Sequence, residues 1–317
     1  MESAAPFFVG ANLPWLRYGG DFGANRWATR GGLSQRGDAE ATIDRLHLLK
    51  SSGVSVLRWF TLCDGRAGLQ VEPDGTPAGL DDFFLRDFDT ALDWVSRAGL
   101  TLLPVLLDFH WCHRRRDEGG VQIGGRRRVL ASASAREALV DRVLAPLFAR
   151  YGRDPLIHAW DLINEPEWAT FGLGTWNPFV GVQPSAMRGY IRLAAERAHA
   201  LAQQPITVGS ASTRWLPLVV GLGLDFYQPH WYDKFEARNP LATPVSALAC
   251  DRPVVLGEFP TNGSAHPPER LLATARQAGY HGALFWSVFA DDTATDFTCA
   301  QTGLAAWNGG DGDTSRA

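Results

Sequence analysis

Two glutamates end apolar segments of the sequence, and their positions suggest the chemistry of a carboxylate pair. Glu165 follows Asn164 in the run AWDLINEPEW, residues 159–168, and Glu258 lies near the end of PVVLGEF, residues 253–259. A single glutamate at a strand end is more often part of a surface salt bridge than a catalyst. Two carboxylates whose surroundings separate their pKa values can divide the roles of acid and nucleophile. Cleavage of a glycosidic bond needs that division.

Other polar and aromatic residues lie at the ends of similar apolar segments, where each segment leads into a loop. They are Asn12, Trp15, Arg58, Trp59, Asp108, His110, Trp111, Trp168, His230, Trp231, Tyr232 and Trp286. If these ends share one rim, an arginine, two histidines and several aromatic rings surround the two glutamates. We expect at least two of the tryptophans at positions 15, 59, 111, 168 and 231 to serve packing only.

Eight strand-like segments supply these ends, and helical segments separate most of them. The strand-like segments cover residues 7–13, 54–62, 101–110, 156–165, 206–212, 224–232, 253–259 and 282–289. Several are apolar almost throughout, as in parallel strands that are covered on both faces. Helical spacing occurs at 38–53, 81–99, 134–152, 185–204 and 267–279, and more weakly at 215–223 and 239–250. The alternation predicts an α/β fold, a (β/α)8 TIM barrel whose chemistry lies at the carboxyl ends of its strands.

A doubly wound open sheet is the structural alternative. Such a sheet normally carries a G-x-G-x-x-G turn after its first strand, and the corresponding segment here, ANLPWLRYGG, lacks that spacing. No linker or repeat divides the chain. We therefore expect one catalytic domain over residues 1–317, with a frayed tail after about residue 307.

The composition gives no sign of a nucleic-acid or membrane partner. The 317 residues are 45% hydrophobic and 20% charged, with a formal net charge of -4. No apolar run approaches the roughly 20 residues of a membrane-spanning helix. The first residues show no secretion signal, which predicts a cytoplasmic protein, or a secreted one if the native N-terminus lies upstream. Cys63 and Cys112 follow strands expected to be neighbours, so a disulfide between them stays an open alternative.

Taken in order, the strand-end residues resemble the active-site set of clan A glycoside hydrolases, and most of all that of family 5, the cellulase and mannanase family. The matching residues span positions 58 to 286 and are Arg58, His110, Asn164, Glu165, His230, Tyr232, Glu258 and Trp286. The resemblance implies a retaining β-glycoside hydrolase with Glu165 as general acid/base and Glu258 as nucleophile.

The same resemblance implies roles for the other rim residues. Arg58 and Tyr232 would lie beside Glu258, where the guanidinium favours the ionised carboxylate. The substrate-binding residues would be Arg58, His110, Asn164, His230, Tyr232 and Trp286. Apart from the resemblance, the strand-end positions of Asn12, Trp111 and Trp168 predict further substrate contacts. No cofactor or metal is implied. The sequence HWCH at 110–113 is not expected to bind a metal, because a strand-to-loop passage does not bring its two histidines together.

The substrate and two alternative functions stay open. Residues 57–70, LRWFTLCDGRAGLQ, resemble family 5 mannanases, so β-mannan or a β-mannoside is slightly favoured over β-1,4-glucan, with endo or exo action undecided. A transglycosylase and a non-catalytic carbohydrate-binding barrel are the alternatives. The segment RRRDEGGVQIGGRRR, residues 114–128, is expected to be a surface loop, or else a lid or a grip on an acidic or branched substrate. We expect a monomer whose partner is a β-linked oligo- or polysaccharide.

Overall fold

The centre of the molecule is a barrel of eight parallel strands. The computed structural model describes residues 6–236 and 238–310. Seven strand pairs are hydrogen-bonded in the spatial order β10-β9-β8-β5-β2-β1-β12-β11. The remaining gap, between the segments of β10 and β11, is closed by parallel bridges that join Tyr227 to Val254 and His230 to Glu258. The strands are β1 (Phe8–Asn12), β2 (Val54–Phe60), β5 (Thr101–Val105), β8 (Trp160–Asn164), β9 (Ile206–Ser210), β10 (Gln228–Pro229), β11 (Leu256–Pro260) and β12 (Gly282–Trp286).

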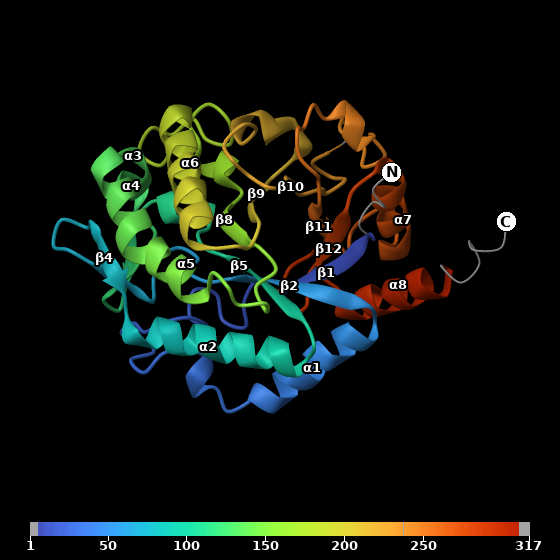
Figure 1. Cartoon of the computed structure of the whole chain (residues 1–317), viewed down its shortest axis with the longest axis horizontal. Coiled ribbons are helices and arrows are strands. Elements are labelled where there is room, and N and C mark those ends of the chain that lie inside the picture. The colour runs from blue at the N-terminus through green and yellow to red at the C-terminus, as the bar shows by residue number, and fades with distance from the viewer. Residues whose placement is uncertain (1–5, 237, 311–317) are drawn as a thin grey trace.

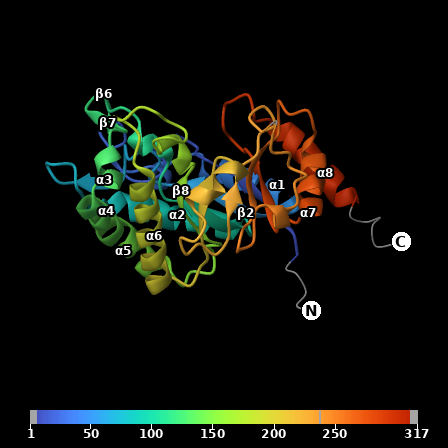
Figure 2. The same ribbon diagram turned by 90° about the horizontal axis from the view of Figure 1, so that it is seen from above.

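Helices surround the strands and bury their outer faces (Figure 1). Figures 1 and 2 show α3 to α6 on one side of the barrel and α7 with α8 on the opposite side. The helices are α1 (Ala39–Ser51), α2 (Asp82–Arg97), α3 (Arg127–Ala131), α4 (Ala133–Leu139), α5 (Ala145–Tyr151), α6 (Pro184–Leu201), α7 (Pro268–Ala278) and α8 (Phe297–Gly310). The predicted (β/α)8 barrel is thus confirmed.

Helix α2 illustrates why the sequence periodicity predicted its element correctly. The Asp81 carboxylate caps its first turn by accepting a hydrogen bond from the Phe84 backbone N–H at 2.8 Å. Phe84, Phe88, Leu92 and Val95 recur at three- and four-residue steps and are all buried. One face of the helix therefore packs on the barrel while the other faces solvent.

Proline accounts for the main departures from the predicted elements. The helix expected at 134–152 is interrupted by a π-helical turn at Val140–Leu144, ahead of Pro146 at the start of α5, which cannot donate a backbone hydrogen bond. The weak helix expected at 215–223 is a 3-10 helix at Thr213–Leu218 that contains Pro217. In the region 239–250, only Val245–Ala247 forms a 3-10 turn.

Two hairpins and the C-terminal helix were not predicted from the sequence. Strands β3 (Leu69–Val71) and β4 (Pro77–Leu80) pair antiparallel, as do β6 (Arg116–Glu118) and β7 (Val121–Ile123). Helix α8 runs to Gly310, beyond the expected start of a frayed tail near residue 307, and residues 311–317 of that tail lie outside the described residues. Cys63 and Cys112 are both buried and free, so they form no disulfide. No helix in the described ranges has the length and apolarity needed to span a membrane.

The barrel interior is apolar at one level and polar at the next. An apolar cluster there takes its residues from several strands and the positions beside them: Val56, Leu103, Ala159, Phe226, Val255 and Leu284. The polar level contains Arg58, Asp161 and Gln228, each fully buried. Interior layers of this kind are expected of a small barrel, and the polar level is the base of the site described next.

Candidate active site

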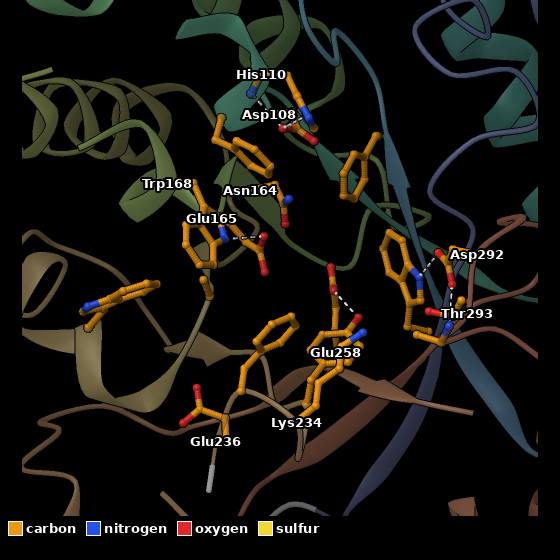
Figure 3. Close-up of a pocket in the computed structure, with 18 of the residues that line it drawn as sticks. Asp108, His110, Asn164, Glu165, Trp168, Lys234, Glu236, Glu258, Asp292 and Thr293 are labelled. Carbon is orange, nitrogen blue, oxygen red and sulfur yellow. Dashed lines mark hydrogen bonds and ion pairs between the residues drawn. The ribbon is translucent and has the colours of Figure 1, made fainter. Parts of the chain in front are cut away.

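Glu165 occupies an unusual backbone position directly after β8. Its φ and ψ of 45° and 52° lie in the left-handed region, between β8 and the 3-10 turn Pro166–Ala169. Non-glycine residues rarely adopt this conformation, and when they do the position is often functional. The conformation is held by the Glu165 backbone N–H, which donates to the Gly209 carbonyl on β9 at 2.6 Å. The Glu165 side chain, 17% exposed, points into a cavity at the barrel mouth (Figure 3).

The surroundings of Glu165 favour its protonated form. The Trp168 indole N–H donates to its Oε2 at 3.0 Å, and His230 Nδ1 lies 2.9 Å from its Oε1. Burial raises the pKa of Glu165 to about 7, and the negative charge of Asp108 adds to the effect. Arg58 and the Trp168 hydrogen bond oppose the shift only in part. A carboxyl group with this pKa can donate a proton near neutral pH.

Glu258, on β11, is held by two donors. Arg58 Nη1 donates to its Oε1 at 2.8 Å, and the Tyr232 hydroxyl donates to its Oε2 at 2.7 Å. Burial raises the pKa of Glu258, while His230, Arg58 and the Tyr232 hydrogen bond lower it and so offset part of that rise. Arg58 therefore lowers the pKa of Glu258, as expected, but not enough to reverse the rise that burial causes.

Arg58 is the central residue of the polar level. Its guanidinium donates to Asp161 Oδ2 from Nε at 3.0 Å, to Asn12 Oδ1 at 2.9 Å and to Asn164 Oδ1 at 2.8 Å, in addition to Glu258. Because Asp161 also pairs with the Arg58 guanidinium, only part of its positive charge is available to stabilise ionised Glu258. The pairing with several acceptors satisfies a guanidinium that is 0% exposed.

Asn12 and Trp111 do not line the site, in contrast to the sequence prediction for both residues. Asn12 is buried beneath Arg58, and its side-chain amide donates to the carbonyls of Gly257 and Phe285 at 3.0 and 3.2 Å, so it orients the guanidinium. Trp111 is 0% exposed and packs in the main core, with the Arg126 guanidinium 5.8 Å from its ring centroid. Its ring points inward because residues 109–112 form a 3-10 turn rather than a continuation of the strand.

His230 faces both carboxylates with one nitrogen. Its Nδ1 lies 2.9 Å from Glu165 Oε1 and 3.4 Å from Glu258 Oε2, and its Nε2 has no hydrogen-bond partner among the described residues. Burial lowers the pKa of His230 to about 4, so the ring is neutral at neutral pH. With a carboxylate acceptor at Nδ1, the neutral tautomer that fits carries its proton there.

The cavity between the two glutamates has aromatic walls and a volume of about 400 Å³. On one side, Trp286 and Trp15 meet edge to face with ring centroids 6.0 Å apart. On the other, Trp168 and Trp215 meet at 5.1 Å. The apolar ring faces can pack on the C–H faces of a sugar while the polar groups bind its hydroxyls. Figure 3 shows Glu165, Glu258, Asn164 and Trp168 arranged around this single space.

The remaining predicted residues divide between the cavity and the core. His110 lines the cavity, and its Nδ1 lies 2.7 Å from Asp108 Oδ1. Burial lowers the pKa of His110, but the Asp108 hydrogen bond and charge outweigh it, so that the pKa is raised. Among the rim tryptophans, Trp59 and Trp231 are buried in the main core. Together with Trp111 they confirm that at least two of the five serve packing only.

Several residues of the cavity and of the polar level beneath it were missed from the sequence. Asp161 carries a charge inside a strand that is otherwise apolar, a signal that could have identified it as the partner of a buried cation. Trp215 follows the predicted fifth strand by three residues, but in a segment read as a weak helix. The loop after β10 also reaches the cavity, with Lys234, Phe235 and Glu236. The sequence gives no sign that this loop folds back over the cavity, so these contacts are seen only in the structure.

One group within residues 6–236 and 238–310 could also hold a metal ion. Glu165, His230 and Glu258 each present one possible ligand atom, and these atoms lie within 4.8 Å of one another. The Nδ1 atom of His230 already contacts both carboxylates. The same 4.8 Å limit shows that the two carboxyl groups approach closely over the cavity.

Comparisons with known proteins agree with this fold. No protein-family model matches the chain. The chain is 22% identical over 320 residues to a mannan endo-1,4-beta-mannosidase of Mytilus edulis, covering 89% of this chain and 83% of the relative. It is 22% identical over 326 residues to the enzyme of the same name from Cryptopygus antarcticus, covering 88% and 80%. The crystal structure of endo-1,4-beta-mannanase from Eisenia fetida superimposes with a TM-score of 0.77 at 21% identity, covering 96% of this chain and 91% of that one. These similarities, at 21–22% identity, show that the chain shares the barrel fold of β-mannanases, in agreement with the resemblance to family 5 of the clan A glycoside hydrolases that the strand-end residues indicated.

Proposed function

We propose that the protein hydrolyses internal β-1,4 linkages of mannan with retention of anomeric configuration. The observation that carries the proposal is the close approach of Glu165 and Glu258, with one carboxylate oxygen of each within 4.8 Å of one oxygen of the other. Retaining enzymes keep their two carboxyl groups about 5–5.5 Å apart, whereas inverting enzymes leave roughly 6.5–9.5 Å for a water. The different surroundings of the two acids support a division of roles between them.

The contacts of each acid fit one step of a double displacement. Glu258 Oε2 or Oε1 attacks the anomeric carbon, and the bond from that carbon to the leaving oxygen breaks as Glu165 gives the oxygen its proton. Glu165, now ionised, takes a proton from water, whose oxygen then displaces Glu258 from the sugar. Arg58 and Tyr232 hold the attacking carboxylate in place through their hydrogen bonds at 2.8 and 2.7 Å. Asn164, whose Oδ1 is engaged by Arg58, keeps its amide N–H groups for a sugar hydroxyl.

The relatives support mannan as the substrate. Both carry the name mannan endo-1,4-beta-mannosidase, and each is matched over most of its length. Endo action needs a cleft that binds several sugars. A second cavity shares Trp15 and His110 with the first, so the binding surface extends beyond the cleavage point.

A substrate panel with product analysis tests this function. We expect release of reducing ends from β-1,4-mannan and little from cellulose or xylan, with equal rates in the presence and absence of EDTA because no step uses a metal. Proton NMR of the first product should show the β-anomer before mutarotation. An α-anomer at early times would contradict retention, and activity confined to cellulose or xylan would contradict the substrate.

The pH dependence should report the proton on Glu165. Because the acid must be protonated and its pKa lies at about 7, kcat/KM is expected to fall as pH rises through that value. The Trp168 N–H stabilises the ionised form, so Trp168→Phe should raise the pKa and move the alkaline limit of the profile to higher pH. Trp215→Phe, which changes the neighbouring ring without a bond to Glu165, is the matched control. An unmoved alkaline limit in Trp168→Phe would argue against Glu165 as the titrating acid.

A further inference from the structure

A second cavity adjoins the candidate active site. Its volume is about 560 Å³, and Trp15 and His110 form part of the wall of both cavities. Its remaining wall consists of Tyr18, Asp64, Arg66, His113, Arg114, Arg116 and Ile123. The two cavities are therefore neighbours on the same face of the barrel, and a bound glycan that fills the first can extend toward the second.

The wall of the second cavity has an excess of positive charge. Asp64 is neutralised by Arg66, whose Nη2 lies 2.6 Å from Asp64 Oδ2. Arg114 lines the cavity and has neither a hydrogen bond nor an ion pair within the described part of the chain. Arg116 has only Glu118 at 3.8 Å, and both side chains are more than half exposed, so that pair contributes little. Two guanidinium groups are thus available to a ligand.

The hairpin that carries these arginines is fixed to the barrel. The Gly125 N–H donates to the His113 carbonyl at 2.7 Å, and the Arg126 N–H donates to the Trp111 carbonyl at 2.7 Å. The buried Arg126 side chain donates to the Gly65 carbonyl at 2.6 Å and lies over the Trp111 ring. Trp111, although it does not touch the cavity, therefore helps to hold the base of this segment. A fixed base lowers the conformational entropy that ligand binding must overcome.

A further polar group in the same wall lacks a partner. The Tyr18 hydroxyl is shielded from solvent and makes no hydrogen bond to any described residue. Its ring packs against Trp15 and has the Arg66 guanidinium 4.9 Å from its centroid. Because the hydroxyl is shielded from solvent, other atoms of Tyr18 form its part of the cavity wall, and a ligand would reach the hydroxyl only after a side-chain movement.

We propose that this second cavity is a subsite for a sugar that carries a carboxylate, such as a uronic acid residue of the bound glycan. Arg114 and Arg116 would bind the carboxylate, since a guanidinium matches its two oxygens in a bidentate geometry. Asp117 and Glu118 follow these arginines directly in the sequence and could compete for them, but they do not line the cavity. The inference rests on the proposed glycan-cleaving function and extends it to substrates with acidic residues.

The experiment uses β-1,4-mannotetraose and four derivatives, each oxidised to mannuronic acid at one position. Binding is measured by calorimetry with the Glu258→Gln protein, which prevents turnover. We expect one derivative, the one whose acid reaches the second cavity, to bind about tenfold more tightly than the parent at low salt, as one charge-assisted hydrogen bond would give. High salt should reduce the gain.

Two variants assign the effect to the cavity. The double change Arg114→Ala with Arg116→Ala should abolish the gain. Arg115→Ala removes a charge from the same hairpin but not from this cavity, and should keep it. The proposal is overturned if no derivative binds more tightly than the parent, or if Arg115→Ala abolishes the gain as well. Cleavage of unmodified mannan by the wild-type protein distinguishes the two failures. If mannan is cleaved but no derivative gains affinity, only the subsite is contradicted. If mannan is not cleaved, the proposed function is contradicted, and the subsite with it.

Discussion

Glu258→Gln is expected to lower kcat/KM on mannan by roughly 10³-fold or more, which corresponds to about 4 kcal/mol of activation free energy. The amide cannot attack the anomeric carbon, although it keeps the shape of the side chain. Folding should be preserved because Arg58 retains Asp161, Asn12 and Asn164 as acceptors. Steady-state rates and thermal unfolding of the same preparations measure the two effects separately. Glu40→Gln, which removes an exposed carboxylate on α1, should leave the rate unchanged.

The anomeric outcome of chemical rescue distinguishes a nucleophile from an acid that only supports the site. In Glu258→Ala, azide can enter the vacated space and attack an aryl β-mannoside directly, giving the α-mannosyl azide. In Glu165→Ala, Glu258 still forms the glycosyl intermediate, and azide then gives the β-mannosyl azide. If the two variants gave the same anomer, or if Glu258→Gln kept most of the wild-type rate, the assignment of roles would be wrong.

The fold could be predicted from the sequence because its signals are local. Eight apolar runs and the periodicity of segments such as 81–99 depend on neighbouring residues only. Prediction failed where a proline or a short turn replaced regular structure, and it also missed the two hairpins and α8. Strand β10 has two residues, Gln228 and Pro229, although the apolar run that contains it is much longer. Proline has no N–H to continue the ladder.

Part of the candidate site's residue list could be predicted from the sequence, but not the arrangement of those residues. Residue type and strand-end position identified Glu165, Glu258 and Arg58. Neither indicates that Asn12 lies under the guanidinium or that Trp111 turns into the core, because those outcomes depend on side-chain packing between distant segments. Gly209 was not identified at all, since a glycine in a strand gives no chemical signal.

Gly209 nevertheless lies where the polar level and the two acids meet. Its carbonyl accepts the Glu165 N–H at 2.6 Å, and its own N–H donates to Asp161 Oδ1 at 3.1 Å. A Cβ atom at this position would lie 2.5 Å from Arg58 Nη2, 3.0 Å from His230 Nε2 and 3.1 Å from Asp161 Oδ2. Because Arg58 is held by acceptors on several strands, it cannot move aside freely. Glycine is required here for space.

Gly209→Ala is therefore expected to lower kcat/KM by about 10²-fold, as displacements of about 1 Å can, and to cost about 1–3 kcal/mol of folding stability through overpacking. A displaced Arg58 would lower the Glu258 pKa less than it does now, so the carboxylate would need higher pH to ionise. The acid limit of the pH–rate profile should then move to higher pH, a shift that a merely less stable protein would not show. Gly37→Ala is the matched control, since a Cβ atom there meets nothing within 4 Å. A Gly209→Ala protein with wild-type kcat/KM and an unmoved acid limit would show that Arg58 does not govern the ionisation of Glu258.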